Sequence, residues 1–133
     1  MRRLVFALSL LITASMVSPA QAAADPGSCD DPSCVPGIDR IVELGSYCDN
    51  TTYHVFATTA SGRVVFCDSA RGLPARYFRS LPLAGIRDYN SPCTQPYTQV
   101  AQGPDGLFLL CATHMFPDGR GEARWVRGDH YDY

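Results

Sequence analysis

Two short strips of the sequence place arginine next to an aromatic residue, and they are the best candidates for a binding function. The strips are Ala75-Arg76-Tyr77-Phe78-Arg79 and Ala123-Arg124-Trp125-Val126-Arg127. A guanidinium beside an exposed ring can bind a phosphate, a carboxylate or an anionic sugar while the ring stacks on the ligand. The alternative is that the rings belong to the core and the arginines keep a strand edge charged. The candidate binding residues are Arg76, Tyr77, Arg79, Arg124, Trp125 and Arg127.

Residue types suited to catalysis do not form a recognisable set. His54, His114 and His130 lie in unrelated sequence contexts, and the sequence has no G-x-S-x-G motif. We expect all six cysteines to be oxidised, which leaves no thiol nucleophile. Metal-binding spacings such as C-x-x-C do not occur either. The sequence therefore predicts a protein that is not an enzyme, with no catalytic residues, no cofactor and no metal site.

The C-terminal end contains two weaker motifs. Arg127-Gly128-Asp129 spells the integrin-binding tripeptide, but its first two residues already belong to the repeated pattern described next, so we do not expect adhesion. The tail 129–133 has a histidine and two carboxylates that could hold a metal ion. Short polar ends usually fray, which favours a tail without a site.

The two strips occupy equivalent places in two copies of one pattern, 41–80 and 86–128. Each copy has a cysteine, a tyrosine, an alanine four residues after it, a glycine and a second cysteine before the strip. An internal repeat predicts an architecture before it predicts an activity. The matching residues are Cys48, Tyr53, Ala57, Gly62 and Cys67 in the first copy, and Cys93, Tyr97, Ala101, Gly106 and Cys111 in the second.

Within each copy the residue types favour a β-hairpin followed by the strip as a third strand. In the first copy, Tyr53–Thr59 is aromatic and β-branched, Ser61-Gly62 predicts a tight turn, and Arg63–Cys67 returns. In the second copy the strands are Tyr97–Gln102 and Leu107–Cys111, and Asp105-Gly106 between them predicts a turn in which both residues take positive φ. The return strands are apolar at consecutive positions, which indicates burial on both faces and a central place in a sheet.

These elements predict an all-β fold. We expect a small disulfide-stapled domain of two pseudo-repeated units, each a hairpin extended to three or four strands, packed as a sandwich or barrel. Residues 25–40 form an irregular N-terminal segment that contains cysteines, and 81–85 join the units. Between Cys111 and Ala123 the second unit has a loop four residues longer than its counterpart, so asymmetry is expected there.

Six cysteines in a small exported chain indicate a disulfide framework. For the four cysteines of the repeats, pseudo-symmetry leaves pairing within units, between like positions, or swapped between units. We favour pairing within units, because closing a loop of about 20 residues constrains the unfolded chain by about 3 kcal/mol. A turn at Ser61-Gly62 places Cys67 opposite Phe56 and not opposite Cys48, so the segment that contains Cys48 must fold back over the hairpin. The predicted disulfides are Cys29–Cys34, Cys48–Cys67 and Cys93–Cys111.

Residues 1–24 have the composition of a signal peptide. Arg2 and Arg3 precede an apolar run, and small residues allow cleavage after Ala22 or Ala24. The run is shorter than the about 20 residues of a transmembrane helix, although an uncleaved anchor is the alternative. We expect a secreted protein, in the extracellular or cell-envelope space, with no membrane contact after cleavage.

The chain that follows the signal peptide is mildly acidic. Without Arg2 and Arg3, nine of the 11 basic residues remain against 13 acidic ones, a formal charge of −4. This charge argues against nucleic acid as a partner. All the basic residues are arginine.

The pattern of cysteine, glycine turn, cysteine and downstream aromatic resembles small modules in exported proteins of actinobacteria, mycobacteria in particular. The residues that make the resemblance are Cys48, Gly62, Cys67 and Tyr77, then Cys93, Gly106, Cys111 and Trp125. Such proteins have no assigned activity. The resemblance covers about two-thirds of the chain, and it implies secretion and an arginine-only composition.

We therefore expect a monomeric, non-catalytic binding module of the extracellular space or cell envelope, whose partner is an envelope glycan or an extracellular protein. The runner-up is a secreted enzyme inhibitor that presents Gly72-Leu73-Pro74 or Met115-Phe116-Pro117 as a rigid loop. A small secreted hydrolase is the third hypothesis.

Overall fold

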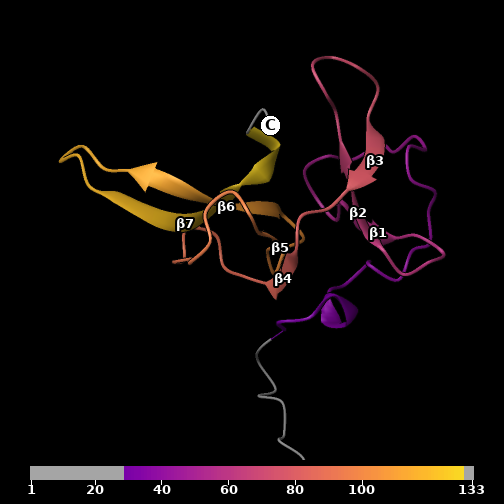
Figure 1. The fold of residues 1–133 in the computed structure, drawn as a ribbon, viewed down its shortest axis with the longest axis horizontal. Helices are drawn as coiled ribbons and strands as arrows, with labels where there is room; N and C mark the ends of the chain where they lie inside the picture. The colour runs from indigo at the N-terminus through magenta and orange to yellow at the C-terminus, as the bar shows by residue number, and fades with distance from the viewer. Residues whose placement is uncertain (1–28, 131–133) are drawn as a thin grey trace, which may run out of the picture.

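The computed structural model describes residues 29–130, so the predicted signal peptide and residues 131–133 lie outside the described residues. Within this range the protein is all-β, as predicted, with one sheet of three strands, one of four, and two short 3-10 turns. No helix in the described part of the chain is long and apolar enough to cross a membrane. Figure 1 shows the two sheets side by side.

The three-stranded sheet belongs to the first unit, 41–80. It consists of β1 (Phe56–Thr58), β2 (Val64–Asp68) and β3 (Arg76–Arg79), all antiparallel and in this order. The middle strand is β2, as its consecutive apolar residues predict, and Val65 is fully buried in it. The third strand is the first Arg-aromatic strip.

The four-stranded sheet contains the second unit, 86–128. Its order is β4 (Leu83–Ile86), β5 (Val100–Gln102), β6 (Phe108–Met115) and β7 (Gly121–Arg127). β4 runs parallel to β5, and the other neighbours are antiparallel. The second Arg-aromatic strip lies in β7.

The segment between the units is a strand and not a simple linker. Leu83 is buried, and the backbone of Ile86 donates a hydrogen bond of 2.7 Å to the carbonyl of Cys29. Gly85 has a φ of +92°, and a Cβ there would overlap the Cys29 carbonyl. The N-terminal segment therefore lies directly against β4, which explains both the strand and its glycine.

Three hairpins, β1–β2, β5–β6 and β6–β7, share one turn, a three-residue loop that ends in glycine. The loops end at Gly62, Gly106 and Gly119, whose φ angles lie between +79° and +93°. Only the glycine of each loop needs the left-handed conformation, so the expectation of positive φ at Asp105 is wrong. The three-residue loop also shifts the register by one, which places Phe56 opposite Phe66. Cys67 consequently hydrogen-bonds to Val55 and does not lie opposite Phe56.

The first strand of each hairpin begins later than predicted. His54 has a φ of +50° and Tyr97 a φ of +61°, and neither conformation continues a strand. The predicted strands Tyr53–Thr59 and Tyr97–Gln102 are therefore reduced to β1 and β5.

The expected long loop between Cys111 and Ala123 is mostly strand. β6 and β7 remain paired out to Met115 opposite Gly121, and Pro117-Asp118-Gly119 makes the turn. This hairpin arm points away from the three-stranded sheet in Figure 1. The asymmetry predicted for this region is real, but it is an ordered projection.

One core connects the two sheets, with Phe108 at its centre. The Phe108 ring lies 5.6 Å from that of Phe56 and 5.4 Å from that of Phe66, measured between ring centroids. A second, smaller cluster lies on the other side of the four-stranded sheet around Trp125 and Leu109. Burial of the apolar rings in the shared core provides the main favourable contribution to packing the units together.

The disulfides join Cys29 to Cys34, Cys48 to Cys67 and Cys93 to Cys111, which is pairing within units. In both units the bridged Cα atoms are 5.9 Å apart. Three disulfides in a chain of this size indicate an oxidising compartment.

Candidate functional site

The aromatic residues of the two strips are part of the core. The side chains of Tyr77 and Trp125 are 7% and 2% exposed, and each lies opposite the second cysteine of its unit. A stacking role for these two rings is therefore wrong. Successive residues on a strand face opposite sides, so the exposed ring of the first strip is the next one, Phe78, which is 41% exposed.

The first arginine of each strip holds the backbone that leads into its unit. The Arg76 guanidinium donates a hydrogen bond of 2.7 Å to the carbonyl of Gly45, and Arg124 donates one of 2.6 Å to the carbonyl of Asn90. Arg76 also lies 3.9 Å from the centre of the Tyr47 ring. Both guanidinium groups are thus engaged within the fold and support the scaffold.

The backbone around the strips is bonded in the same way in both units. In each unit the backbone amide of the first cysteine donates to the carbonyl of the alanine that begins the strip. The amide of the buried aromatic residue donates to the carbonyl of the serine two positions before that cysteine. These bonds are Cys48 to Ala75 (3.1 Å) and Tyr77 to Ser46 (3.0 Å), then Cys93 to Ala123 (3.0 Å) and Trp125 to Ser91 (2.9 Å).

The last arginine of the second strip is neutralised by its own chain. Arg127 binds Asp129 through two contacts of 3.1 Å and 2.8 Å, and Asp129 also accepts a hydrogen bond of 3.1 Å from the hydroxyl of Thr52. The hydrogen bond to Asp129 raises the pKa of Arg127 above its usual range, and the nearby phenol of Tyr53 adds to this effect. The Arg127-Gly128-Asp129 tripeptide is thus closed on itself and cannot offer both charges to an integrin.

The end of the chain is also more ordered than a frayed tail. Gly128–His130 forms the 3-10 turn η2, and the side chain of Asp129 is only 11% exposed. Residues 131–133 of the predicted tail lie outside the described residues. Asp129 is therefore held within the fold by its contacts with Arg127 and Thr52.

Arg79 is the strip arginine that the fold does not use. It lies opposite Val65 as Arg127 lies opposite Leu109, so the two arginines hold the same place in their units. Within the described part of the chain the Arg79 side chain makes no hydrogen bond or ion pair. Its charge is therefore available to a ligand.

Arg79 lines a mainly apolar cleft where the two units meet, which we call the junction cleft. Its volume is about 390 Å³. Phe78 and Tyr97 are 41% and 54% exposed, so two aromatic rings from different units face solvent at its walls. The lining residues are Phe66, Asp68, Ala70, Phe78, Arg79, Leu81, Tyr97 and Val100.

Phe78 and Tyr97 were not among the sequence candidates, although each had a signal. Phe78 lies in the first strip, on the strand face opposite Tyr77, and Tyr97 is one of the two repeated tyrosines. The sequence does not predict that Phe78 and Tyr97 line the same cleft, because this depends on how the two sheets pack.

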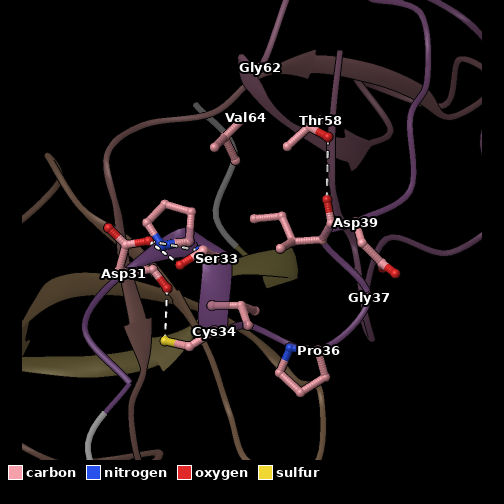
Figure 2. A pocket seen from close by; sticks show the side chains of 12 residues that line it. Asp31, Ser33, Cys34, Pro36, Gly37, Asp39, Thr58, Gly62 and Val64 are labelled. Carbon is pink, nitrogen blue, oxygen red and sulfur yellow. Dashed lines mark hydrogen bonds between the residues drawn. The ribbon is translucent and has the colours of Figure 1, made fainter. Parts of the chain in front are cut away.

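A larger hollow of about 730 Å³ lies between the N-terminal segment and the β1–β2 hairpin (Figure 2). Three of its polar side chains, those of Asp31, Ser33 and Thr58, already form hydrogen bonds within the fold. Asp31 accepts hydrogen bonds of 2.7 Å and 2.9 Å from the hydroxyl and the amide of Ser33, and these bonds lower its pKa. The hydroxyl of Thr58 donates to the carbonyl of Ile38 at 3.4 Å. The junction cleft is the better candidate for a ligand site, because the Arg79 side chain that lines it has no hydrogen-bond or ion-pair partner among the described residues.

The other chemistry-bearing residues are dispersed. The ring of His54 lies against Gly106, and His114 makes an edge-to-face contact of 5.0 Å with Phe116 on the hairpin arm. Among residues 29–130, no three His, Cys, Asp or Glu side chains gather so as to hold a metal ion.

The two loops considered for an inhibitor are both exposed. Leu73 is 64% exposed and projects from the loop between β2 and β3, and Met115 is 62% exposed near the tip of the arm. The carbonyl of Leu73 accepts a hydrogen bond of 2.7 Å from the hydroxyl of Ser69, which holds that loop against its own base.

Comparison of this chain with family models, with curated proteins and with solved structures finds no match, so its own residues are the basis for a function.

Proposed function

We propose that this protein is a secreted, non-catalytic binding module that holds its ligand in the junction cleft. The observation that supports this most strongly is the position of Arg79, the one strip arginine that has no partner among the described residues, beside the exposed rings of Phe78 and Tyr97. An unpaired guanidinium next to apolar surface suits a ligand with an anionic group and an apolar or ring-shaped body.

Two further features support this proposal. The disulfides agree with export to the extracellular or cell-envelope space, which the N-terminal sequence also predicts. The matched backbone bonds around the strips support descent of the two units from one duplicated module. In a duplicated scaffold, the features that differ between copies are the best candidates for a specific function.

The test uses the mature, oxidised protein on an array of envelope glycans and extracellular peptides. We expect retention that falls about tenfold or more in Arg79→Ala and in Phe78→Ser, because each removes one of the two contacts that orient the ligand. Arg63→Ala is the matched control, since Arg63 is also exposed but does not line the cleft. Retention that is equal in wild type and both cleft variants would exclude this cleft as the binding surface.

An inhibitor is the second candidate, favoured by the exposure of Leu73 in a loop that is braced by Ser69. Such a protein should slow a secreted protease with apolar specificity and be cleaved slowly within the loop between β2 and β3. A Leu73→Asp variant should lose this inhibition while it keeps binding in the junction cleft. No inhibition at micromolar concentrations would remove the candidate.

A further inference from the structure

The place in the second unit that corresponds to Arg79 is filled by the chain itself. There the arginine is Arg127, and the group that fills the place is the carboxylate of Asp129. The contact is bidentate, the geometry that a planar guanidinium offers to a carboxylate. In the second unit, the arginine at this register position thus binds a carboxylate.

The two arginines correspond in their surroundings as well as in their register. Tyr97, from the second unit, lines the junction cleft together with Arg79 of the first. Conversely, the hydroxyl of Thr52 from the first unit donates a hydrogen bond of 3.1 Å to Asp129, the residue paired with Arg127. Each arginine site therefore includes a residue at or next to the repeated tyrosine of the other unit.

The residues that follow each arginine explain why only one site is filled. After Arg127 the chain turns back through Gly128, whose lack of a side chain allows it to lie against the ring of Phe108. After Arg79 it continues through Ser80 and on to β4, and the Ser80 hydroxyl is bonded to the next carbonyl at 2.7 Å. The first unit has no acidic residue in the position of Asp129, so its own chain supplies no carboxylate to Arg79.

The other charged residue of the cleft is Asp68, whose carboxylate accepts a hydrogen bond of 2.7 Å from the amide of Ser69. Asp68 and Phe66 share one face of β2. Arg79 pairs with Val65, which belongs to the other face of β2. An incoming carboxylate would be repelled by Asp68 and attracted by Arg79, so the two residues would orient an acidic ligand along the cleft.

We propose that the junction cleft binds an acidic peptide segment of another protein, with an aspartate carboxylate on Arg79 as Asp129 lies on Arg127. An apolar side chain next to that aspartate packs between Phe78 and Tyr97. A peptide is favoured over an acidic glycan because the group that fills the equivalent place is itself an aspartate in a glycine-containing turn. This inference rests on the proposed binding function and names the class of ligand.

The test measures binding of the blocked peptide acetyl-Leu-Gly-Asp-Leu-amide to the oxidised protein by amide NMR. We expect shifts at Phe78, Arg79 and Tyr97, and affinity about tenfold weaker when the peptide carries Asn in place of Asp. Arg79→Gln should weaken binding to the same extent, and Asp68→Asn should strengthen it. Arg63→Gln, away from the cleft, should leave the affinity unchanged.

Three results would overturn the inference. They are no binding of the peptide, equal binding of the Asp and Asn peptides, or equal binding to wild type and Arg79→Gln. A parallel titration with a glucuronic acid disaccharide separates this failure from failure of the proposed function. If the sugar shifts the cleft residues and the peptide does not, the binding function stands and the peptide is wrong.

Discussion

The two units have one scaffold and use the end of their third strand differently. Arg79 and Arg127 hold the same register, but the second is paired with Asp129 and the first faces the junction cleft. The difference arises from the residues after the strip, which turn back in the second unit and continue to β4 in the first. Arg127 is thus paired within its own chain, whereas Arg79 lines a cleft between the two units.

A second contrast lies at the start of the return strands, where Val64 and Phe108 hold equivalent places. Phe108 is 1% exposed at the centre of the shared core, whereas Val64 is only partly buried and lines the hollow beside the N-terminal segment. At this position, therefore, only the second unit contributes a fully buried side chain to the shared core.

The largest effect should come from Phe108→Ala. It removes a ring that contacts both Phe56 and Phe66, so we expect a loss of about 3–5 kcal/mol in the free energy of unfolding. Val64→Ala, at the equivalent place, should cost about 1 kcal/mol because its side chain is only partly buried. Urea unfolding measures both, and equal losses would contradict the asymmetry of the core.

Removing one of the two unit disulfides should cause the next largest loss in the free energy of unfolding. This loss should be equal in the two units. The bridges span separations of 19 and 18 residues, so replacing either cysteine pair by alanine should cost about 3 kcal/mol. The Cys29–Cys34 bridge closes only five residues and should cost about 2 kcal/mol. A difference above about 1 kcal/mol between the two unit bridges in urea unfolding would show that the units respond differently.

Substituting the hairpin glycines by alanine should distinguish the two units by a smaller difference in the free energy of unfolding. Gly62→Ala should cost about 1–2 kcal/mol for its positive φ alone, since nothing lies within 4 Å of the added Cβ. Gly106→Ala should cost more, because its Cβ would also overlap the His54 ring. Thermal unfolding of Gly106→Ala combined with His54→Ala should recover the difference. No recovery would mean that the clash is not the cause.

The smallest effect concerns the arm, which only the second unit has. The amide of Arg120, and then its guanidinium, lower the pKa of Asp118 in the folded protein. Its contribution to stability is thus present above the ordinary Asp pKa of about 3.9 and is lost as the pH falls through the lower folded value.

An NMR titration of the Asp118 carboxyl carbon tests this order of causes. Arg120→Ala should keep most of the lowering because the backbone amide remains, whereas Arg120→Pro should abolish it. A normal Asp118 pKa in Arg120→Ala would reverse the order of the two causes.

Much of the fold could be predicted because it depends on local chemistry. Runs of β-branched and aromatic residues specify strands, and the apolar return strands specify the middle of each sheet. The predicted register of the first hairpin is wrong by one residue. Ser61-Gly62 predicts a two-residue turn, whereas the glycine closes a three-residue loop. The same Pro-Asp-Gly triplet occurs at 104–106 and 117–119, and its second occurrence was the missed signal for the arm.

The candidate site was predictable only in part. The strips correctly drew attention to Arg79, but their shared pattern concealed that Tyr77 is buried and that Phe78 is the exposed ring. Arg127 pairs with Asp129 only two residues away, but the Asp129 carboxylate is also held by Thr52, 77 residues earlier in the sequence. Such long-range contacts follow from the packing of the sheets and leave no mark in a local pattern.

The central place of Phe108 also sets an order of events during synthesis. The core against which Phe56 and Phe66 pack is incomplete until the ribosome has added most of the chain. The first unit therefore emerges with its apolar face uncovered and depends on a residue made later. We therefore expect folding to be completed only late in synthesis, and a nascent chain that stops before Phe108 to be sensitive to proteases.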